Sequence, residues 1–138
     1  MNNFDTGEIL LSTACECYDE MLRAYERKSW NMVVRRAQEV VELSLKGLLK
    51  IMGVEYPKSH DVGKIFERVC MEKGFRIEQT VLDELNRISS DLASKRGPAF
   101  YMEEIFEKQD AEKAKADAEV VLNFARSLTE ILKRQFKL

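Results

Sequence analysis

The chain has 138 residues, of which 45% are hydrophobic and 33% are charged, values typical of one globular domain and not of a disordered segment. Its 22 basic and 24 acidic residues give a net charge of −2, which excludes a general basic field for nucleic acid. With six glycines and two prolines, it has few residues for the turns of a β-sandwich or barrel. We therefore expect a single domain over residues 1–138 that is built from helices.

In the first half of the chain, apolar residues recur at steps of three and four. This spacing predicts a helix over about 5–28, capped by Asp5 or Thr6, and a second helix over about 29–53. Gly47 lies inside the second helix, where glycine costs about 1 kcal/mol relative to alanine. The close approach of a neighbouring helix would offset that cost.

The middle of the chain begins with a connector over residues 54–59, because Pro57 keeps the residue before it out of helical geometry. A third helix is expected to open at Ser59 or His60. It should end at Gly74, since glycine is common just past a helix end.

In the last part of the chain, a fourth helix is expected over about 78–95, broken by Gly97 and Pro98. The stretch 99–109 carries many large apolar side chains and should form an irregular loop or a short helix. A final helix is expected over about 110–136.

Five amphipathic helices with short connectors predict an all-α fold, an antiparallel up-and-down bundle. The final helix would be roughly 40 Å long at 1.5 Å per residue, longer than a small bundle needs. Part of it is therefore expected to pack on a second copy, which gives a homodimer.

The cysteines and the hydropathy indicate in which cellular compartment the protein is expected to work. The three cysteines do not form the even set of a disulfide framework, and we expect them to behave as small buried apolar residues. Neither a metal nor a cofactor is expected. No stretch approaches the roughly 20 apolar residues that span a membrane, and residues 1–11 lack the pattern of a secretory signal. These features predict a cytoplasmic protein without a membrane partner.

His60 is the only histidine, and it is therefore the one side chain expected to transfer protons near neutral pH. It either binds a ligand or takes part in catalysis, or it only opens the third helix by bonding a nearby backbone group. The sequence has no phosphate-cradling glycine loop, nucleophile elbow or paired-cysteine zinc spacing.

Two compact basic pairs could meet an anion: Arg35-Arg36 and Lys95-Arg96. The planar arginine fork suits phosphate, and Phe100 or Tyr101 nearby could stack on a base. The alternative is structural, since basic residues in the last turn of a helix interact favourably with its dipole.

Several motifs together resemble the HEPN domain family over about residues 10–132. Residues 36–49 read RAQEVVELSLKGLL, and Gly53, Pro57 and the run SHDV at 59–62 follow them. The run KRGP at 95–98 is similar to a later Arg-x-Pro element of the family, and the acidic, alanine-rich stretch 110–121 also fits.

The resemblance implies a five-helix bundle, often dimeric, with a link to nucleotides or RNA. Many members work beside a small nucleotidyltransferase encoded next to them, commonly as toxin–antitoxin pairs. RNA-cleaving members carry an arginine followed after four to six residues by a histidine. At the matching distances, Arg96 is followed by Tyr101, Met102 and Glu103. Tyrosine titrates near pH 10, so Tyr101 would be a poor proton shuttle at neutral pH.

We therefore expect a binding module without catalysis of its own, which binds a nucleotide or RNA phosphate or docks a nucleotidyltransferase. Arg96 is the expected main phosphate contact, with Lys95 and His60 assisting and Tyr101 as a stacking surface. Arg36 is a further candidate ligand contact.

Two alternatives remain open. One is a metal-independent ribonuclease whose site forms across a dimer, with Arg96 steadying the phosphate and His60 or Tyr101 moving protons. The other is a purely structural interaction protein that uses its long last helix as a surface.

Overall fold

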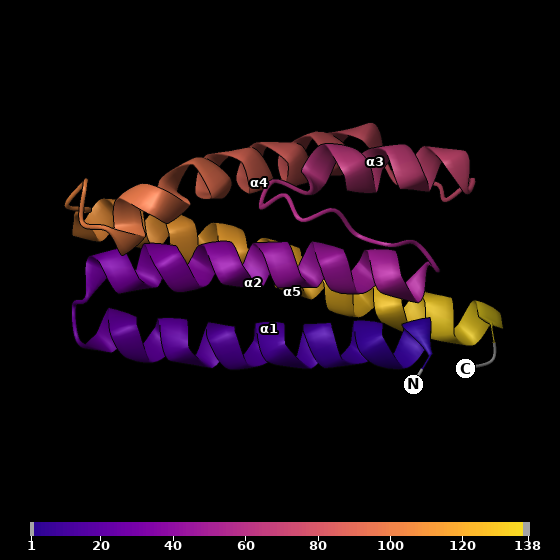
Figure 1. The fold of residues 1–138 in the computed structure, drawn as a ribbon, viewed down its shortest axis with the longest axis horizontal. Coiled ribbons are helices and arrows are strands. Elements are labelled where there is room, and N and C mark those ends of the chain that lie inside the picture. Colours follow the sequence, from indigo (N-terminus) through magenta and orange to yellow (C-terminus); the bar gives the residue numbers. More distant parts are fainter. Residues whose placement is uncertain (1, 137–138) are drawn as a thin grey trace.

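The computed structural model describes residues 2–136, and within that range it has five helices and no strand (Figure 1). The prediction of an all-helical, five-helix fold is confirmed. In the described part, no helix is both long and apolar enough to cross a membrane. The helices are α1 (Asn3–Glu26), α2 (Trp30–Ile51), α3 (Gly63–Glu72), α4 (Gln79–Phe100) and α5 (Lys108–Phe136).

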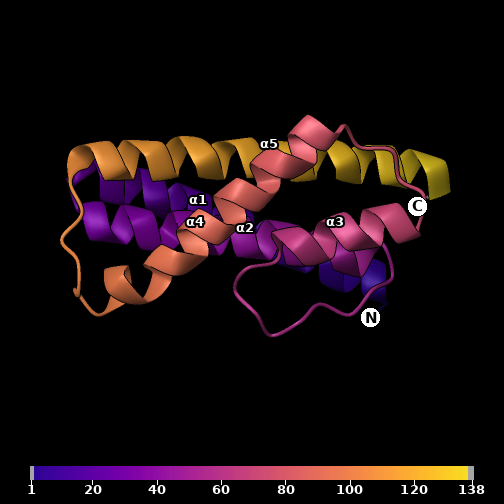
Figure 2. The same cartoon turned by 90° about the horizontal axis from the view of Figure 1, so that it is seen from above.

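Helix α2 is central and contacts each of the other four helices. Helices α1, α2 and α5 run along the length of the molecule, and α3 and α4 lie over another side of α2 (Figure 1). The connector between α2 and α3 doubles back, so α3 runs in the same direction as α2, and α4 then crosses α2 obliquely (Figure 2). This crossing brings the end of α4 close to the first half of α2.

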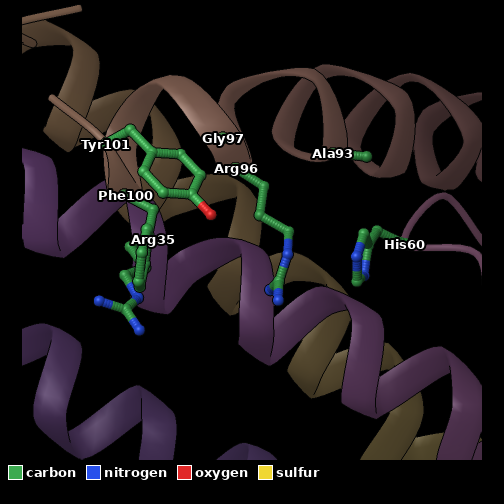
Figure 3. Close-up of a pocket in the computed structure, with 7 residues that line it drawn as sticks. All are labelled: Arg35, His60, Ala93, Arg96, Gly97, Phe100 and Tyr101. Atoms are coloured by element: carbon green, nitrogen blue, oxygen red, sulfur yellow. The ribbon is translucent and has the colours of Figure 1, made fainter. Parts of the chain in front are cut away.

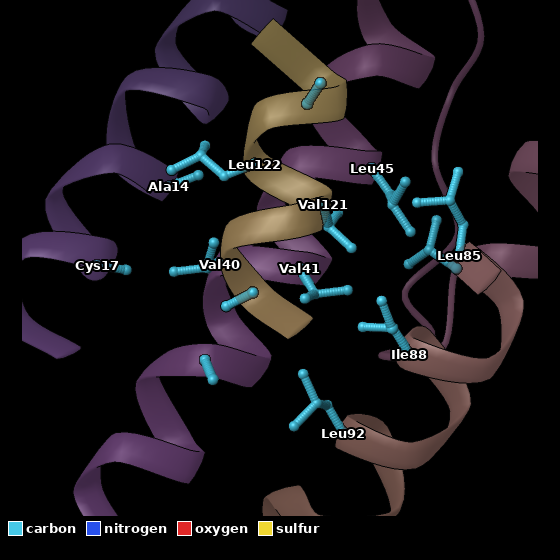
Figure 4. Packing of buried hydrophobic residues seen from close by; sticks show 14 of the residues in the cluster. Ala14, Cys17, Val40, Val41, Leu45, Leu85, Ile88, Leu92, Val121 and Leu122 are labelled. Carbon is cyan, nitrogen blue, oxygen red and sulfur yellow. The ribbon is translucent and has the colours of Figure 1, made fainter. Parts of the chain in front are cut away.

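The hydrophobic core forms around α2, because its apolar residues face neighbours on several sides and not along one stripe. Burial of such side chains is the main driving force of folding, about 25 cal/mol for each Å² of apolar surface removed from water. Figure 4 shows side chains of four helices meeting there: Val40, Val41 and Leu45 of α2, Ala14 and Cys17 of α1, Leu85, Ile88 and Leu92 of α4, and Val121 and Leu122 of α5.

The three cysteines are free, and two of them, Cys17 and Cys70, are buried, while Cys15 is half-buried. Burial is the main reason that the pKa of Cys17 and that of Cys70 are each raised to about 11, with nearby carboxylates adding to the effect. Thiols in such surroundings stay protonated and behave as small apolar residues.

Helices α1 and α2 approach each other closely at two glycines, as the sequence suggested for Gly47. A Cβ atom on Gly7 would lie 2.7 Å from the carbonyl oxygen of Gly47 and 2.6 Å from Cγ1 of Ile51. A Cβ atom on Gly47 would lie 3.0 Å from the carbonyl oxygen of Gly7. The helix pair therefore depends on the absence of a side chain at both positions.

We expect Gly7→Ala to lower the free energy of unfolding by about 1 kcal/mol, measured by urea denaturation. Overpacking costs about 1–3 kcal/mol, which exceeds the gain of about 1 kcal/mol in helix propensity. Ser12→Ala is the control on the same helix, because Ser12 is exposed and alanine there adds helix propensity without the close approach of α2. That variant should keep only the propensity gain, and equal stability of the two variants would contradict the prediction.

Helix α1 begins earlier than predicted, so the cap assigned to Asp5 or Thr6 is wrong. Asn2 is the cap: its side-chain oxygen accepts a hydrogen bond from the Asp5 amide at 2.8 Å. The Asp5 carboxylate accepts one from the Asn2 amide at 3.4 Å. These reciprocal bonds form a capping box, in which Asp5 occupies the third helical position.

Helix α3 begins at Gly63, so its predicted opening at Ser59 or His60 is also wrong. The first amides of α3 are bonded by a side chain of another helix. Ser89 Oγ, on α4, accepts hydrogen bonds from the amides of Val62 and Gly63 at 3.0 and 3.1 Å. A local sequence pattern cannot reveal a cap that comes from a distant helix.

The predicted break of α4 at Gly97-Pro98 is wrong, because α4 continues through Pro98 to Phe100. Proline removes one backbone hydrogen bond, and here it does so in the last turn, where few bonds remain. The turn still closes, with the Tyr101 amide donating to the Gly97 carbonyl at 2.9 Å. The irregular segment is therefore 101–107, and α5 begins at Lys108, two residues before the predicted start.

Candidate functional site

A pocket of about 320 Å³ lies where α2, the end of α4 and the α2–α3 connector meet (Figure 3). Figure 3 shows the Arg96 side chain reaching from α4 toward α2, between Tyr101 and His60. The pocket is lined by Arg35 of α2, His60 of the connector, Ala93, Arg96, Gly97 and Phe100 of α4, and Tyr101 just after it.

The fold thus brings together three of the candidates singled out from the sequence, Arg96, His60 and Tyr101. It adds Arg35, which sequence reasoning grouped with Arg36 but did not choose. A signal for Arg35 exists in the sequence: Arg35, Gln38 and Glu42 are spaced by three and four residues and so share one face of α2.

The Arg96 guanidinium is held by a neutral group. Its NH1 atom donates a hydrogen bond to Oε1 of Gln38 at 3.1 Å. Among residues 2–136, no carboxylate lies within ion-pair distance of Arg96, in contrast to Lys95, which pairs with Asp91 at 3.1 Å. Arg96 therefore lines the pocket as a cation that is held by a neutral partner.

The Arg35 guanidinium lies over the Phe100 ring at the wall of the pocket. Its guanidinium carbon is 4.1 Å from the centroid of the Phe100 ring, and its Nε atom is 3.6 Å from Oε1 of Glu39. The Phe100 and Tyr101 rings pack edge to face at 4.7 Å between centroids. Tyr101 is 70% exposed, so its ring remains accessible to a ligand.

Behind the pocket, the carboxylate of Glu42 accepts three hydrogen bonds. Its Oε1 atom accepts from Nε2 of Gln38 at 2.8 Å and from Nδ1 of His60 at 2.9 Å, and its Oε2 atom accepts from Nζ of Lys46 at 2.8 Å. Burial raises the pKa of Glu42, but the bonds from Lys46, Gln38 and His60 together outweigh burial and leave this pKa below its usual range. Glu42 is therefore ionised at neutral pH.

We expect Glu42 to make stability sensitive to acid. The folded-state pKa of Glu42 is depressed, so its contribution is complete above the unfolded value of about 4.3 and is lost as pH falls through the folded value. Urea titrations of wild type and Glu42→Gln should give a difference in unfolding free energy that shrinks as pH falls below about 5. Glu16→Gln, at an exposed glutamate, is the control, and a difference for Glu42→Gln that is the same at every pH would contradict the prediction.

The other two candidates point elsewhere. The Arg36 guanidinium forms ion pairs at 2.8 Å with Glu20 of α1 and, also at 2.8 Å, with Glu39. Lys95 is held by Asp91 on its own helix. Neither residue belongs to the pocket lining, and both charges already have acidic partners.

The loop 101–107 is fixed to the start of α2 by Asn31, a residue that the sequence did not single out. Its Nδ2 atom donates to the Glu104 carbonyl at 2.8 Å, and its Oδ1 atom accepts from the Phe106 amide at 2.9 Å. Phe106 is buried in the core. These contacts hold the loop in place, and with it Tyr101 at the edge of the pocket.

The fold and the site define a helical protein with an open cationic pocket beside exposed aromatic side chains. The family model of the HEPN domain matches residues 8–128, a range that contains every residue of the pocket lining, and the chain belongs to this family. The resemblance seen in the sequence is thereby confirmed, and it supports a module related to nucleotides or RNA. Searches of curated proteins and of solved structures found no match.

Proposed function

We propose that this HEPN protein binds a phosphate group of a nucleotide or of RNA in the pocket of Figure 3, without catalysis of its own. The observation that carries the proposal is the Arg96 guanidinium, which lines the pocket and is held by the neutral amide of Gln38. Arg35 and His60 add cationic or hydrogen-bonding groups beside it.

The shape of the pocket supports a small ligand. A volume of about 320 Å³ is at the lower end of small-molecule sites, which suits one phosphate-bearing unit. The phosphate would lie between Arg96 and His60, and a base could stack on Tyr101, since aromatic stacking accepts any base.

A protein partner forms the second part of the proposal. We propose a homodimer that works in the cytoplasm beside a nucleotidyltransferase, as in toxin–antitoxin pairs. Large apolar side chains exposed next to the pocket support a protein contact there, and those on α5 support contact with a second copy. They are Phe100, Tyr101, Met102 and Ile105 near the pocket, and Val120 and Ile131 on α5.

Calorimetry with inorganic phosphate, nucleoside mono- and triphosphates and a short RNA tests the ligand. We expect at least one of them to bind with an affinity that falls as salt is added, because the contact is ionic. A pull-down with a co-encoded nucleotidyltransferase tests the partner. If no ligand binds and no nucleotidyltransferase is captured, the proposal is overturned. A salt-insensitive protein contact without any nucleotide effect would instead favour a purely structural role.

A metal-independent ribonuclease is the second candidate. No histidine stands at the expected spacing after Arg96, but His60 reaches the same pocket from the α2–α3 connector. This observation favours a ribonuclease. In this arrangement Arg96 steadies the phosphate, and His60 or Tyr101 moves protons. RNA cleavage in the presence of a chelator that disappears in Arg96→Ala would support this function. Cleavage unchanged in that variant would overturn it.

A further inference from the structure

Glu42 lies behind the pocket and contacts two groups on which the pocket depends. We propose that Glu42 is a positioning residue: its carboxylate sets the tautomer of His60 directly and the orientation of Arg96 through Gln38. The binding part of this inference rests on the proposed phosphate site.

The first step concerns the proton on His60. An ionised carboxylate can only accept hydrogen bonds, so the 2.9 Å contact with Glu42 Oε1 places a proton on Nδ1 of His60. In the neutral ring, Nε2 then carries the lone pair. Within residues 2–136, Nε2 makes no hydrogen bond, and His60 lines the pocket. The neutral ring thus offers the pocket an acceptor, and the protonated ring offers a donor.

The second step concerns the carboxylate itself. Lys46 bonds Oε2 of Glu42 at 2.8 Å, and only 8% of the Lys46 side chain and 13% of the Glu42 side chain are exposed. The partly buried pair fixes both oxygens in one orientation. Since Lys46 occupies Oε2, Gln38 and His60 share Oε1.

The third step concerns the direction of an amide. Gln38 is 1% exposed, and its Nε2 atom donates to Glu42. Its Oε1 atom must therefore face away from Glu42, and there it accepts from Arg96 at 3.1 Å. The reversed amide would direct its NH₂ group at the guanidinium and its carbonyl oxygen at the Glu42 carboxylate, and neither contact would be a hydrogen bond. The charge on Glu42 thus determines which end of Gln38 meets Arg96.

The arrangement predicts tighter phosphate binding when His60 is protonated, because Nε2 then becomes a donor. The charged and titratable groups around His60 come from each element that faces it. Helix α2 supplies Glu42 in contact, Lys46 behind it and Arg35 across the pocket. Helix α4 supplies Arg96, the loop just after it supplies Tyr101, and the connector supplies the neighbouring Asp61.

The tautomer can be measured without any ligand. His60 is the only histidine, so the imidazole nitrogens of the ¹⁵N-labelled chain belong to one residue. At pH 8 we expect a protonated, pyrrole-type Nδ1 and a pyridine-type Nε2. The opposite tautomer in the wild-type protein would overturn the inference, whatever the variants do.

A double variant, Glu42→Met with Lys46→Met, removes the pair without leaving a buried charge and keeps the net charge unchanged. We expect its His60 ring to adopt the Nε2–H tautomer and its affinity for inorganic phosphate to fall at least fivefold. The matched control, Arg68→Met with Glu72→Met, removes an exposed pair at the same spacing on α3 and should change neither readout.

The two proposals fail in different ways. A wild-type protein with the Nδ1–H tautomer that binds neither phosphate nor nucleotide would refute the proposed function and leave the positioning of His60 standing. A folded double variant that loses the tautomer but binds phosphate as tightly as wild type would refute the positioning role and leave the phosphate site standing.

Discussion

Arg96→Ala is expected to weaken the binding of inorganic phosphate or a nucleotide by about 10- to 100-fold. Hydrogen bonds to charged groups contribute about 1.5–3 kcal/mol, and each 1.4 kcal/mol is a factor of ten in affinity. The protein partner of Arg96 in the described range is the neutral amide of Gln38, so no ion pair has to be broken when a ligand binds. Calorimetry at low salt measures the change.

Two comparisons separate a specific contact from general charge. Arg68→Ala makes the same change of residue and charge on α3, where the Arg68 side chain is 67% exposed, and should alter the affinity by less than about twofold. Lys95→Ala tests the neighbouring basic residue, whose ammonium group is paired with Asp91, and should have a smaller effect than Arg96→Ala. Equal losses in Arg96→Ala and Arg68→Ala would contradict a specific contact at Arg96.

The helices were predictable because each buries an apolar face whose spacing is visible in the sequence. The start of α3 was predicted wrongly because a residue distant in the sequence determines it. Ser89 of α4 caps α3, so the start of α3 cannot be read from residues 59–63 alone. Pro98 lies close enough to the end of α4 for the helix to continue through it, although Gly-Pro usually marks a break.

The site was predictable by residue type and less so by direction. Arg96, His60 and Tyr101 stand out as an arginine, a lone histidine and an aromatic residue near a basic pair. Arg35 and Arg36 are adjacent, but neighbouring residues on a helix point about 100° apart, so one meets the pocket and the other meets α1.

The polar residues behind the pocket were missed for a related reason. Gln38 and Glu42 look like an ordinary solvated helix face until the end of α4 and the connector cover them. What escaped sequence reasoning is therefore the packing of α4 and the connector over α2. That packing converts a surface glutamate into the centre of a hydrogen-bond network.

The placement of the connector leads to the largest expected loss of stability, in Ser89→Ala. The Ser89 hydroxyl is buried, accepts from the amides of Val62 and Gly63, and donates to Oδ1 of Asp61 at 2.7 Å. Alanine would leave two amides without partners, and an unsatisfied buried donor costs about 1–3 kcal/mol. We expect the free energy of unfolding in urea to fall by about 2–4 kcal/mol.

Ser94→Ala is the matched control, since Ser94 is an exposed serine on the same helix whose hydroxyl bonds only the Asp91 carbonyl. It should change stability by less than about 0.5 kcal/mol, and similar losses in both variants would contradict the role of Ser89. Ser89→Ala should also affect the pocket. Ser89 holds the side chain of Asp61, and Asp61 directly follows His60 in the chain. In Ser89→Ala the imidazole nitrogens of His60 should shift toward the Nε2–H tautomer expected for the double variant, because a connector released from α4 no longer keeps Nδ1 against Glu42.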